Sequence, residues 1–419
     1  MYLKKTIQDI EVRGKRCLVR VDFNVPLEEQ DGQMVVSDRT RLTETLPTIE
    51  YLRKEGARII LCSHLGRPAG KADPKQSLRP VAQELSQMLN CDVRFVEDCI
   101  GEKAEAAVEA LKPGEMLLLE NVRFHPEEEK NDESFARKLA ACADVYVNDA
   151  FGSSHRAHAS TAAAARFAPV AVAGLLMQKE LRFLSEELHN PTRPFAAILG
   201  GAKVSDKIRV IDALLDKVDV LLIGGAMAYT FDLAMGRGVG HSLCEPDQVD
   251  VARKALEKAK KVGVQLFLPI DHVIAEKVDF KARTASPLQV TQEGIPSGWQ
   301  GVDIGPATIA AYQREIASAS TILWNGPMGI FEIAACAEGT FSIARAIAEN
   351  KRAKSIIGGG DSAKAVQKAG VADRVSFIST GGGAALELLE GRELPGVAAL
   401  QDKAATCCGG TCRSVHHVH

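Results

Sequence analysis

The sequence predicts an α/β protein made of two doubly wound, Rossmann-like domains with parallel sheets, joined by a helix and a hinge. Short apolar runs of strand length alternate with longer amphipathic segments along the chain, which is typical of parallel βαβ units. The length of 419 residues exceeds what one hydrophobic core normally supports. One helix-like segment followed by prolines separates the apolar runs into two series.

Each series contains enough strands and helices for its own sheet. The strands expected in the first series cover residues 16–23, 57–63, 92–98, 115–120 and 144–150, with helices at 80–89, 102–111 and 133–142. The strands expected in the second series cover residues 195–200, 218–224, 264–269, 320–326, 354–359 and 374–379.

The segment GLLMQKELRFLSEEL has the spacing of one amphipathic helix. Pro191 and Pro194 follow it and end it, so we expect a hinge near residues 189–195. The predicted division is an N-terminal domain at 1–173, a connecting helix at 174–188 and a C-terminal domain at 189–390.

Composition narrows the class of protein. Lysine and arginine total 51 against 54 aspartate and glutamate, so the net charge of −3 favours neither nucleic acid nor an anionic membrane as partner. The first residues lack the apolar run of a secretory signal, and no later run approaches the about 18 apolar residues of a membrane span. We therefore expect a cytoplasmic protein, in which the seven scattered cysteines are reduced structural thiols.

Three glycine-rich strings stand in the second series, each after an apolar run. They are GGAKVSDK at 200–207, IIGGGDSAK at 356–364 and ISTGGGAALELLEG at 378–391. Glycine lets the backbone approach a ligand closely, and the free N–H groups at a helix start favour phosphate. The second half is thus predicted to bind a nucleotide.

Cations take the corresponding positions in the first series. His64, Arg67, Arg123 and Arg156 each follow a predicted strand, and ligands of doubly wound sheets bind outside the carboxyl ends of the strands. Guanidinium groups grip phosphate and carboxylate oxygens in pairs, so these residues predict a pocket for a small, multiply charged anion. A nucleotide on one side and an anion on the other indicate phosphoryl transfer.

The motifs together resemble the phosphoglycerate kinase family. The strings VRVDFNVP, SHLGRP, ENVRFH, VNDAFGSSHRAH, GGAKVSDK, WNGPMGIFE, GGGDSAK and STGGGAALELLEG occur in that family's order across residues 1–402. The resemblance implies reversible phosphoryl transfer from 1,3-bisphosphoglycerate to ADP, giving 3-phosphoglycerate and ATP with Mg²⁺. It further implies a monomeric hinge enzyme whose residues 391–403 return to the N-terminal domain.

The resemblance also implies roles in the N-terminal domain. Asp22 and Asn24 would bind the hydroxyl and carboxylate region of the glycerate, and Arg41 would lie nearest the transferring group. Arg39, two residues earlier, is expected to be a solvated surface charge. The phosphate cradle would consist of His64, Arg67, Arg123 and Arg156, with Gly152 beside the substrate.

Lys203, Lys207 and Asp361 would serve the phosphates of the nucleotide. The resemblance assigns Lys207 to the transferred phosphoryl group and Lys203 to the phosphate chain or transition state; if their segment is helical, the two share one face. A lysine pair at this spacing is also common on a solvated face. Asp361 would hold Mg²⁺, and it could equally cap the helix that follows.

The remaining nucleotide positions follow from the same resemblance. Ser362 would donate to a phosphate oxygen, and Glu332, which alone would be read as a surface residue, would accept from the ribose hydroxyls. Asn325 and Pro327 would shape that loop, while Gly224, Gly225 and Gly301 would face the adenine. Gly201, Ala202 and Gly359 complete the cradle, and Gly360 and Gly383, with the amides of residues 381–383, would stabilise the transferring group.

Other classes fit less well. The string GRPAGKA has the wrong spacing for a Walker motif, and no G-x-G-x-x-G follows the first predicted strand. The histidine pair in HRAH has no third ligand in evidence, which favours a phosphate-facing or packing role over a metal site. A non-catalytic phosphometabolite- or nucleotide-binding protein on the same fold stays open as the alternative.

The last residues depart from the family pattern. Residues 404–419 are expected to be a disordered terminus, or to bind zinc or copper through soft ligands. The candidate ligands are Cys407, Cys408, Cys412, His416, His417 and His419.

Overall fold

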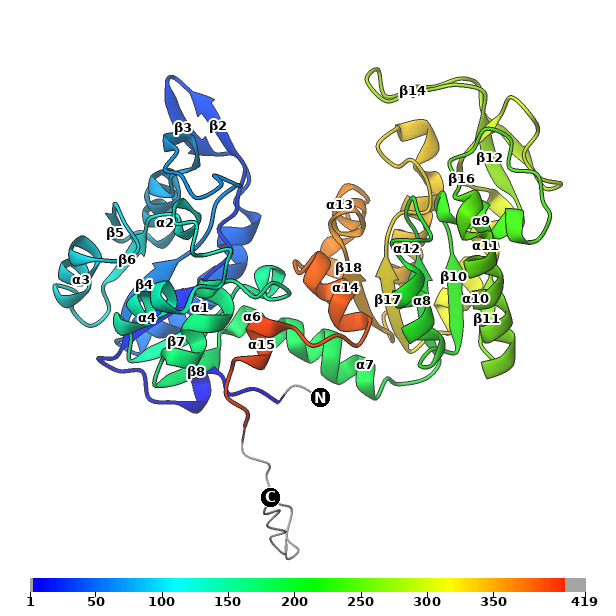
Figure 1. The fold of residues 1–419 in the computed structure, drawn as a ribbon. Coiled ribbons are helices and arrows are strands. Elements are labelled where there is room, and N and C mark those ends of the chain that lie inside the picture. The colour runs from blue at the N-terminus through cyan, green and yellow to red at the C-terminus, as the bar shows by residue number, and fades with distance from the viewer. Residues whose placement is uncertain (1–2, 404–419) are drawn as a thin grey trace, which may run out of the picture.

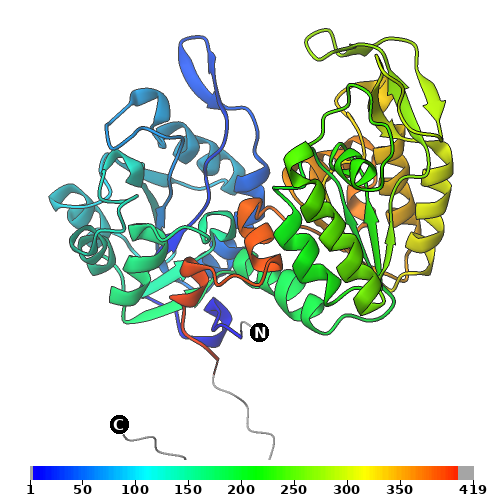
Figure 2. The ribbon, with the colours of Figure 1, turned by 45° about the vertical axis from the view of Figure 1, so that its right-hand side comes forward.

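The computed structural model describes residues 3–403 and contains two α/β units that lie side by side, joined by a helix (Figure 1). The view in Figure 2 shows the same separation of the two units. The Cys/His-rich segment at 404–419, with its predicted disorder and metal ligands, lies outside the described residues. No described helix is both long and apolar enough to cross a membrane.

The first unit is built on a parallel six-stranded sheet in the order β5-β6-β4-β1-β7-β8. Alternate strand residues pack on opposite faces: Leu18 and Ile60 join one buried cluster, while Val19 and Leu61 join another. The sheet is thus covered on both faces, as a parallel sheet requires. Its strands are β1 (Arg16–Arg20), β4 (Arg58–Cys62), β5 (Val93–Val96), β6 (Met116–Leu119), β7 (Val145–Asn148) and β8 (Val170–Ala173).

Five of these strands match the predicted ones, and the sequence analysis missed β8. Its sequence VAVA follows an alanine-rich stretch, where small residues give little signal for a strand. The three predicted helices are confirmed as α2 (Arg79–Leu89), α3 (Glu102–Glu109) and α4 (Glu133–Ala141). The unit also contains α1 (Thr40–Lys54) and the short α5 (Ala164–Phe167).

A hairpin of β2 (Leu27–Gln30) and β3 (Gln33–Val36) projects from the first unit (Figure 1). Its turn residues Asp31 and Gly32 both have positive φ, at 52° and 77°. Asp-Gly is a favoured pair for a two-residue turn of this kind. The hairpin could therefore have been predicted from the dipeptide.

The predicted connecting helix is present as a continuous helical segment. It consists of α6 (Leu175–Leu181), a π-helical stretch (Arg182–Glu186) and α7 (Glu187–His189). The carboxylate of Asp149, just after β7, accepts hydrogen bonds from the backbone of Leu176 and Met177 at 3.0 and 3.1 Å. The helix is thereby anchored to the first unit.

The second unit contains a parallel sheet in the order β11-β10-β9-β17-β18-β19. Numbered by appearance, this is the 3-2-1-4-5-6 order of Rossmann sheets, in which the ligand crevice lies where the order reverses. All six predicted strands are present, and the fold class is confirmed. They are β9 (Phe195–Leu199), β10 (Val220–Ile223), β11 (Gln265–Phe267), β17 (Thr321–Asn325), β18 (Lys354–Gly358) and β19 (Phe377–Ile378).

Helices cover both faces of the second sheet. They are α8 (Ile208–Leu215), α9 (Met227–Ala234), α10 (Val249–Val262), α11 (Pro306–Ser318), α12 (Glu338–Glu349), α13 (Gly360–Lys368) and α14 (Gly383–Leu389). An antiparallel insertion that the sequence analysis did not predict precedes α11. It contains β12 (His272–Ala275), β15 (Gln289–Thr291) and β16 (Gln300–Ile304), with the small pair β13 (Val278–Asp279) and β14 (Thr284–Ala285).

The last described residues lie on the first unit. After α14 the chain forms α15 (Pro395–Ala398), where Gly396 donates its N–H to Ser154 at 2.9 Å. Gln401 pairs with the backbone of Ala171 and Lys5. The two ends of the described chain therefore meet beside β8.

Candidate active site at the two sheet ends

A cavity of about 240 Å³ opens at the carboxyl ends of the strands of the first sheet. All eight residues predicted for substrate binding line it, although they come from five separate segments of the chain. Parallel strands end at the same edge of a sheet, so the loops after β1, β4, β6 and β7 converge there. The lining includes Asp22, Asn24, Arg41, His64, Arg67, Arg123, Gly152 and Arg156.

Arg41 and Arg39 separate as the sequence analysis expected. Arg41 lies in the first turn of α1 and makes an ion pair with Asp22 at 2.7 Å inside the cavity. Arg39 pairs with Glu84 at 2.6 Å, and its side chain is 60% exposed. Only the later arginine is therefore available to an anion in the cavity.

Arg123 is held by the loop after β4. Its Nη1 donates to the carbonyl of Gly66 at 2.8 Å, and the N–H of Gly66 donates to Asn24 Oδ1 at 2.9 Å. The Nε of Arg123 is buried and makes no hydrogen bond to any residue that the structure describes, although it forms an ion pair with Glu129 at 3.4 Å. A buried guanidinium N–H without an acceptor is costly unless a ligand supplies one.

The sequence analysis missed Arg20, a buried residue that contacts the cavity residue His64. Arg20 is a β1 residue and is only 1% exposed. Its Nη2 lies 3.1 Å from His64 Nδ1, and its Nε donates to Ser160 Oγ at 2.8 Å. Ser160 in turn donates to the buried Glu128 at 2.5 Å. The sequence did contain a signal for Arg20, because an arginine within an apolar strand needs buried hydrogen-bond partners.

Histidines of the cavity are held neutral. Burial, and after it the charge of Arg20, keep the pKa of His64 well below its usual range. Burial, and then Arg123, lower the pKa of His158 to about 4. His155 and His158 of the HRAH string both line the cavity, a position that suits the phosphate-facing role, one of the two roles predicted for them. At neutral pH the positive charge therefore belongs to the arginines, and a bound anion would favour protonation of the histidines.

Loops after β9, β10 and β17 of the second sheet pack directly backbone to backbone. A Cβ atom at Gly200 would lie 2.0 Å from the carbonyl oxygen of Pro327, and one at Gly225 would lie 2.6 Å from the nitrogen of Gly201. Gly326 has a φ of +101° and would meet Gly200 in the same way. Only glycine fits at these positions. The strand order reverses between β9 and β17, which is the ligand-binding point of such sheets.

Lys207 and Asn325 meet in this region. Lys207 Nζ donates to Asn325 Oδ1, and burial lowers the pKa of Lys207 to about 8. The amide Nδ2 of Asn325 is buried without an acceptor among residues 3–403, and it lies against Gly358 and Gly359. An unsatisfied donor beside glycine backbone is consistent with a site that receives an oxygen-rich ligand.

Lys203 and Lys207 do not share a helix face, because the segment that contains them is not helical. Residues 200–204 are irregular, residues 205–207 form a turn, and α8 begins at Ile208 with Lys207 as its N-cap. Val204 is fully buried, which draws this segment into the core, while Lys203 is exposed. The two ammonium groups are therefore presented by different local structures.

Asp361 does not cap a helix. The N-cap of α13 is Gly359 with a φ of +88°, and Asp361 lies inside the first turn. Its carboxylate is 57% exposed and lies 3.6 Å from Lys364. Ser362 is fully buried, and its Oγ accepts a hydrogen bond from the N–H of Gly326 at 2.7 Å. The hydroxyl thus ties α13 to the loop after β17.

Other nucleotide candidates lie around the same loops. Gly224 packs against Met328, where a Cβ would approach the sulfur at 2.4 Å. Gly301 belongs to β16 of the unpredicted insertion, and a Cβ there would lie 2.1 Å from the hydroxyl of Tyr229 on α9. Glu332 is exposed beside the buried Phe331.

The third glycine string contacts both the first site and the connecting helix. The backbone before α14 passes so close to the first site that a Cβ at Gly152 would lie 3.6 Å from Thr380 O. A Cβ at Gly383 would lie equally close to His155 Nε2. Glu180 of α6 accepts from Ser379 Oγ at 2.7 Å and from Thr380 N at 2.8 Å, and its burial raises the pKa to about 7.

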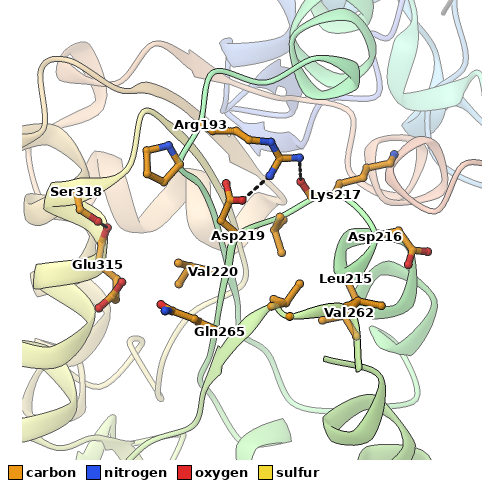
Figure 3. A pocket seen from close by; sticks show the side chains of 14 residues that line it. Arg193, Leu215, Asp216, Lys217, Asp219, Val220, Val262, Gln265, Glu315 and Ser318 are labelled. Carbon is orange, nitrogen blue, oxygen red and sulfur yellow. Dashed lines mark hydrogen bonds and ion pairs between the residues drawn. The ribbon is translucent and has the colours of Figure 1, made fainter. Parts of the chain in front are cut away.

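A larger hollow, of about 880 Å³, opens at the opposite ends of β9, β10 and β11 (Figure 3). Arg193 there pairs with Asp219 at 2.5 Å and donates to the carbonyl of Lys217 at 3.0 Å (Figure 3). Because this hollow lies at the amino ends of the strands, it is remote from the glycine loops and the arginine cavity.

An arginine-lined anion cavity on one doubly wound sheet and a glycine-lined cradle on another define a two-domain kinase that transfers phosphoryl groups. The family model of phosphoglycerate kinase matches residues 7–392. The chain belongs to the phosphoglycerate kinase family.

Individual relatives agree over nearly the full length. The phosphoglycerate kinase of Acidobacterium capsulatum is 54% identical over 406 residues, covering 96% of this chain and 100% of the relative. That of Clostridium tetani is 52% identical over 404 residues, covering 96% and 99%. The solved phosphoglycerate kinase of Coxiella burnetii superposes with a TM-score of 0.86 at 40% identity, covering 94% of this chain and 98% of that one.

Proposed function

We propose that this ATP-dependent kinase binds the three-carbon acid in the arginine-lined cavity and the nucleotide on the glycine loops of the second sheet. The reaction is reversible transfer of a phosphoryl group between 1,3-bisphosphoglycerate and ADP, giving 3-phosphoglycerate and ATP. The observation that carries the proposal is the convergence of Arg41, Arg67, Arg123 and Arg156 on one cavity of about 240 Å³.

Roles in the reaction follow from charge and position. An acyl phosphate is already a reactive donor, so the protein has to align it with ADP and stabilise charge on the transferring oxygens. We assign this stabilisation to Arg41, Lys207, Lys203 and the amides of residues 381–383. Arg41 is held in place by Asp22, and Lys207 is mostly charged at pH 7 because its pKa is about 8.

Mg²⁺ would enter with the nucleotide and bind Asp361. The carboxylate of Asp361 fits this task, because it is largely exposed at the start of α13 and has only a distant ion pair with Lys364. Mg²⁺ commonly joins one protein carboxylate to nucleotide phosphates. When bound, it neutralises phosphate charge. The remaining nucleotide contacts are assigned to the glycine, asparagine and glutamate positions named above.

Domain closure completes the proposal. We place the hinge around residues 189–195, between a domain of residues 1–173 with 391–403 and a domain of residues 189–390, joined through the helix at 174–188. An acyl phosphate must be protected from water, and ligands on two domains can react only after the domains approach. The contacts of Glu180 with Ser379 and Thr380 link the connecting helix to the third glycine string.

We further propose that the protein acts as a cytoplasmic monomer on small molecules, without nucleic acid or membrane as partner. The near balance of charges gives no reason to expect nucleic acid or an anionic membrane as partner. Light scattering at the elution peak of a sizing column measures the oligomeric state directly.

A coupled assay tests the function. Purified protein with ADP and 1,3-bisphosphoglycerate should form ATP and 3-phosphoglycerate, and omission of Mg²⁺ should abolish turnover. Tight binding of both ligands without turnover would instead support the alternative, a non-catalytic binding protein on this fold.

A further inference from the structure

A second group of chemically reactive side chains lies outside the anion cavity. Asp98 and Cys99 follow β5, and His125 follows the short 3-10 turn after β6. Because β5 and β6 are neighbours in the sheet, these two loops leave it side by side. One ligand atom from each of the three residues lies within 4.8 Å of the other two.

Its geometry is close to that of a metal site. His125 Nε2 lies 2.8 Å from Asp98 Oδ1. Ligands at Zn–N, Zn–O and Zn–S distances in a tetrahedral site lie about 3.3 to 3.6 Å apart. The His125–Asp98 pair would therefore open slightly, and any of the three separations that is wider, up to the 4.8 Å limit, would close.

Donor types favour zinc among the common metals. Thiolate, imidazole and carboxylate are its usual ligands, whereas Mg²⁺ prefers oxygen alone. Cys99 closes the site on the core side, since it is fully buried. The side chains of His125 and Asp98 are 27% and 43% exposed, which leaves an entry path and room for water as a fourth ligand.

A hydrolase-like triad is the competing interpretation of the same residue types. A nucleophilic cysteine must be reached by its substrate and must face an imidazole nitrogen that is free to take its proton. Cys99 is fully buried, so a substrate cannot reach its sulfur. This arrangement does not suit nucleophilic catalysis.

We propose that Asp98, Cys99 and His125 bind one Zn²⁺ ion, with water as the fourth ligand. The ion would join the loop after β5 to the loop after β6. His125 is two residues from Arg123, so occupancy would restrain the segment that carries a cavity arginine. The site is separate from the Mg²⁺ that accompanies the nucleotide.

Residues 404–419 contain cysteines and histidines that could also bind zinc, so the test uses a background variant that lacks them. We would use the full chain with Cys407, Cys408 and Cys412 changed to Ser and His416, His417 and His419 changed to Ala. After removal of metal with a chelator, Zn²⁺ alone is titrated by calorimetry, without substrates. We expect one ion per chain, no binding of Mg²⁺ under the same conditions, and a thiolate charge-transfer band when Co²⁺ replaces Zn²⁺.

Variants assign the ligands. Asp98→Asn and His125→Ala should each weaken Zn²⁺ binding at least about 100-fold, and Cys99→Ala should also remove the Co²⁺ charge-transfer band. Cys142→Ala is the matched control, because it removes another buried thiol of the same unit and should bind as the background does. Asp98 is partly exposed, so its variant tests the site even if Cys99→Ala folds poorly.

Absence of binding in the background variant, or unchanged affinity in Asp98→Asn and His125→Ala, would overturn the proposal. These readouts involve no turnover. A failure here is therefore distinct from a failure of the kinase function.

Discussion

Replacement of Arg41 by alanine should separate catalysis from stability. Arg41 contributes one preorganised donor to the cavity, and removal of one such donor typically costs about 2.7–4 kcal/mol in the barrier, or about 10²–10³ in kcat. Its ion pair with Asp22 is 40% exposed on the arginine side, so its contribution to folding is that of a surface pair, about 1 kcal/mol or less. Asp22 also retains contacts with Asn24 N at 3.3 Å and Ser153 Oγ at 3.5 Å.

The chain offers a matched control for this experiment. Arg39→Ala removes the same side chain two residues away, together with an ion pair to Glu84 of similar length. Initial rates in the coupled assay and urea unfolding are measured for both variants and the parent. We expect Arg41→Ala to lose at least about 100-fold in kcat, and Arg39→Ala to retain nearly all of it. Equal rates in the two variants would refute the assignment of Arg41 to the transferring group.

Three further predictions concern Lys207, Glu180 and the hinge. Burial lowers the pKa of Lys207 to about 8, so the affinity of the parent for ADP should fall as pH rises above 8. Lys207→Met should bind ADP weakly, with an affinity that does not change between pH 7 and 9. A variant that keeps the pH profile of the parent would contradict the role of Lys207. Burial raises the pKa of Glu180 from its usual 4.5 to about 7, so its contribution to stability is full below pH 4.5 and is lost as pH rises through 7. The unfolding free energy of Glu180→Gln, measured against pH, should lack that part of the decline, and parallel curves for variant and parent would argue against it. Small-angle scattering should show that ADP and 3-phosphoglycerate together reduce the radius of gyration more than either alone, and equal values would count against closure.

The structure also shows where local sequence was insufficient. β8 was missed because VAVA carries little signal of its own, and it becomes a strand through pairing with β7. The insertion with Gly301 was missed because its strands are two to five residues long and pair antiparallel across intervening loops. Two alternatives that the sequence left open were decided by the structure. Lys203 is not helical, because the buried Val204 draws its segment into the core, and Asp361 is not an N-cap, because Gly359 with its positive φ takes that position.

Sequence by itself determined the alternation of strands and helices, because a doubly wound sheet needs an apolar run for each buried strand and an amphipathic one for each covering helix. It also determined which glycines and arginines follow strands, and therefore the class of ligand at each sheet end. Tertiary structure alone decided the strand order, which places five separate segments around one cavity. It also decided the pairing of Arg20 with His64 and the meeting of Asp98, Cys99 and His125. These contacts depend on the packing of residues far apart in the chain, which the local periodicity of the sequence does not reveal.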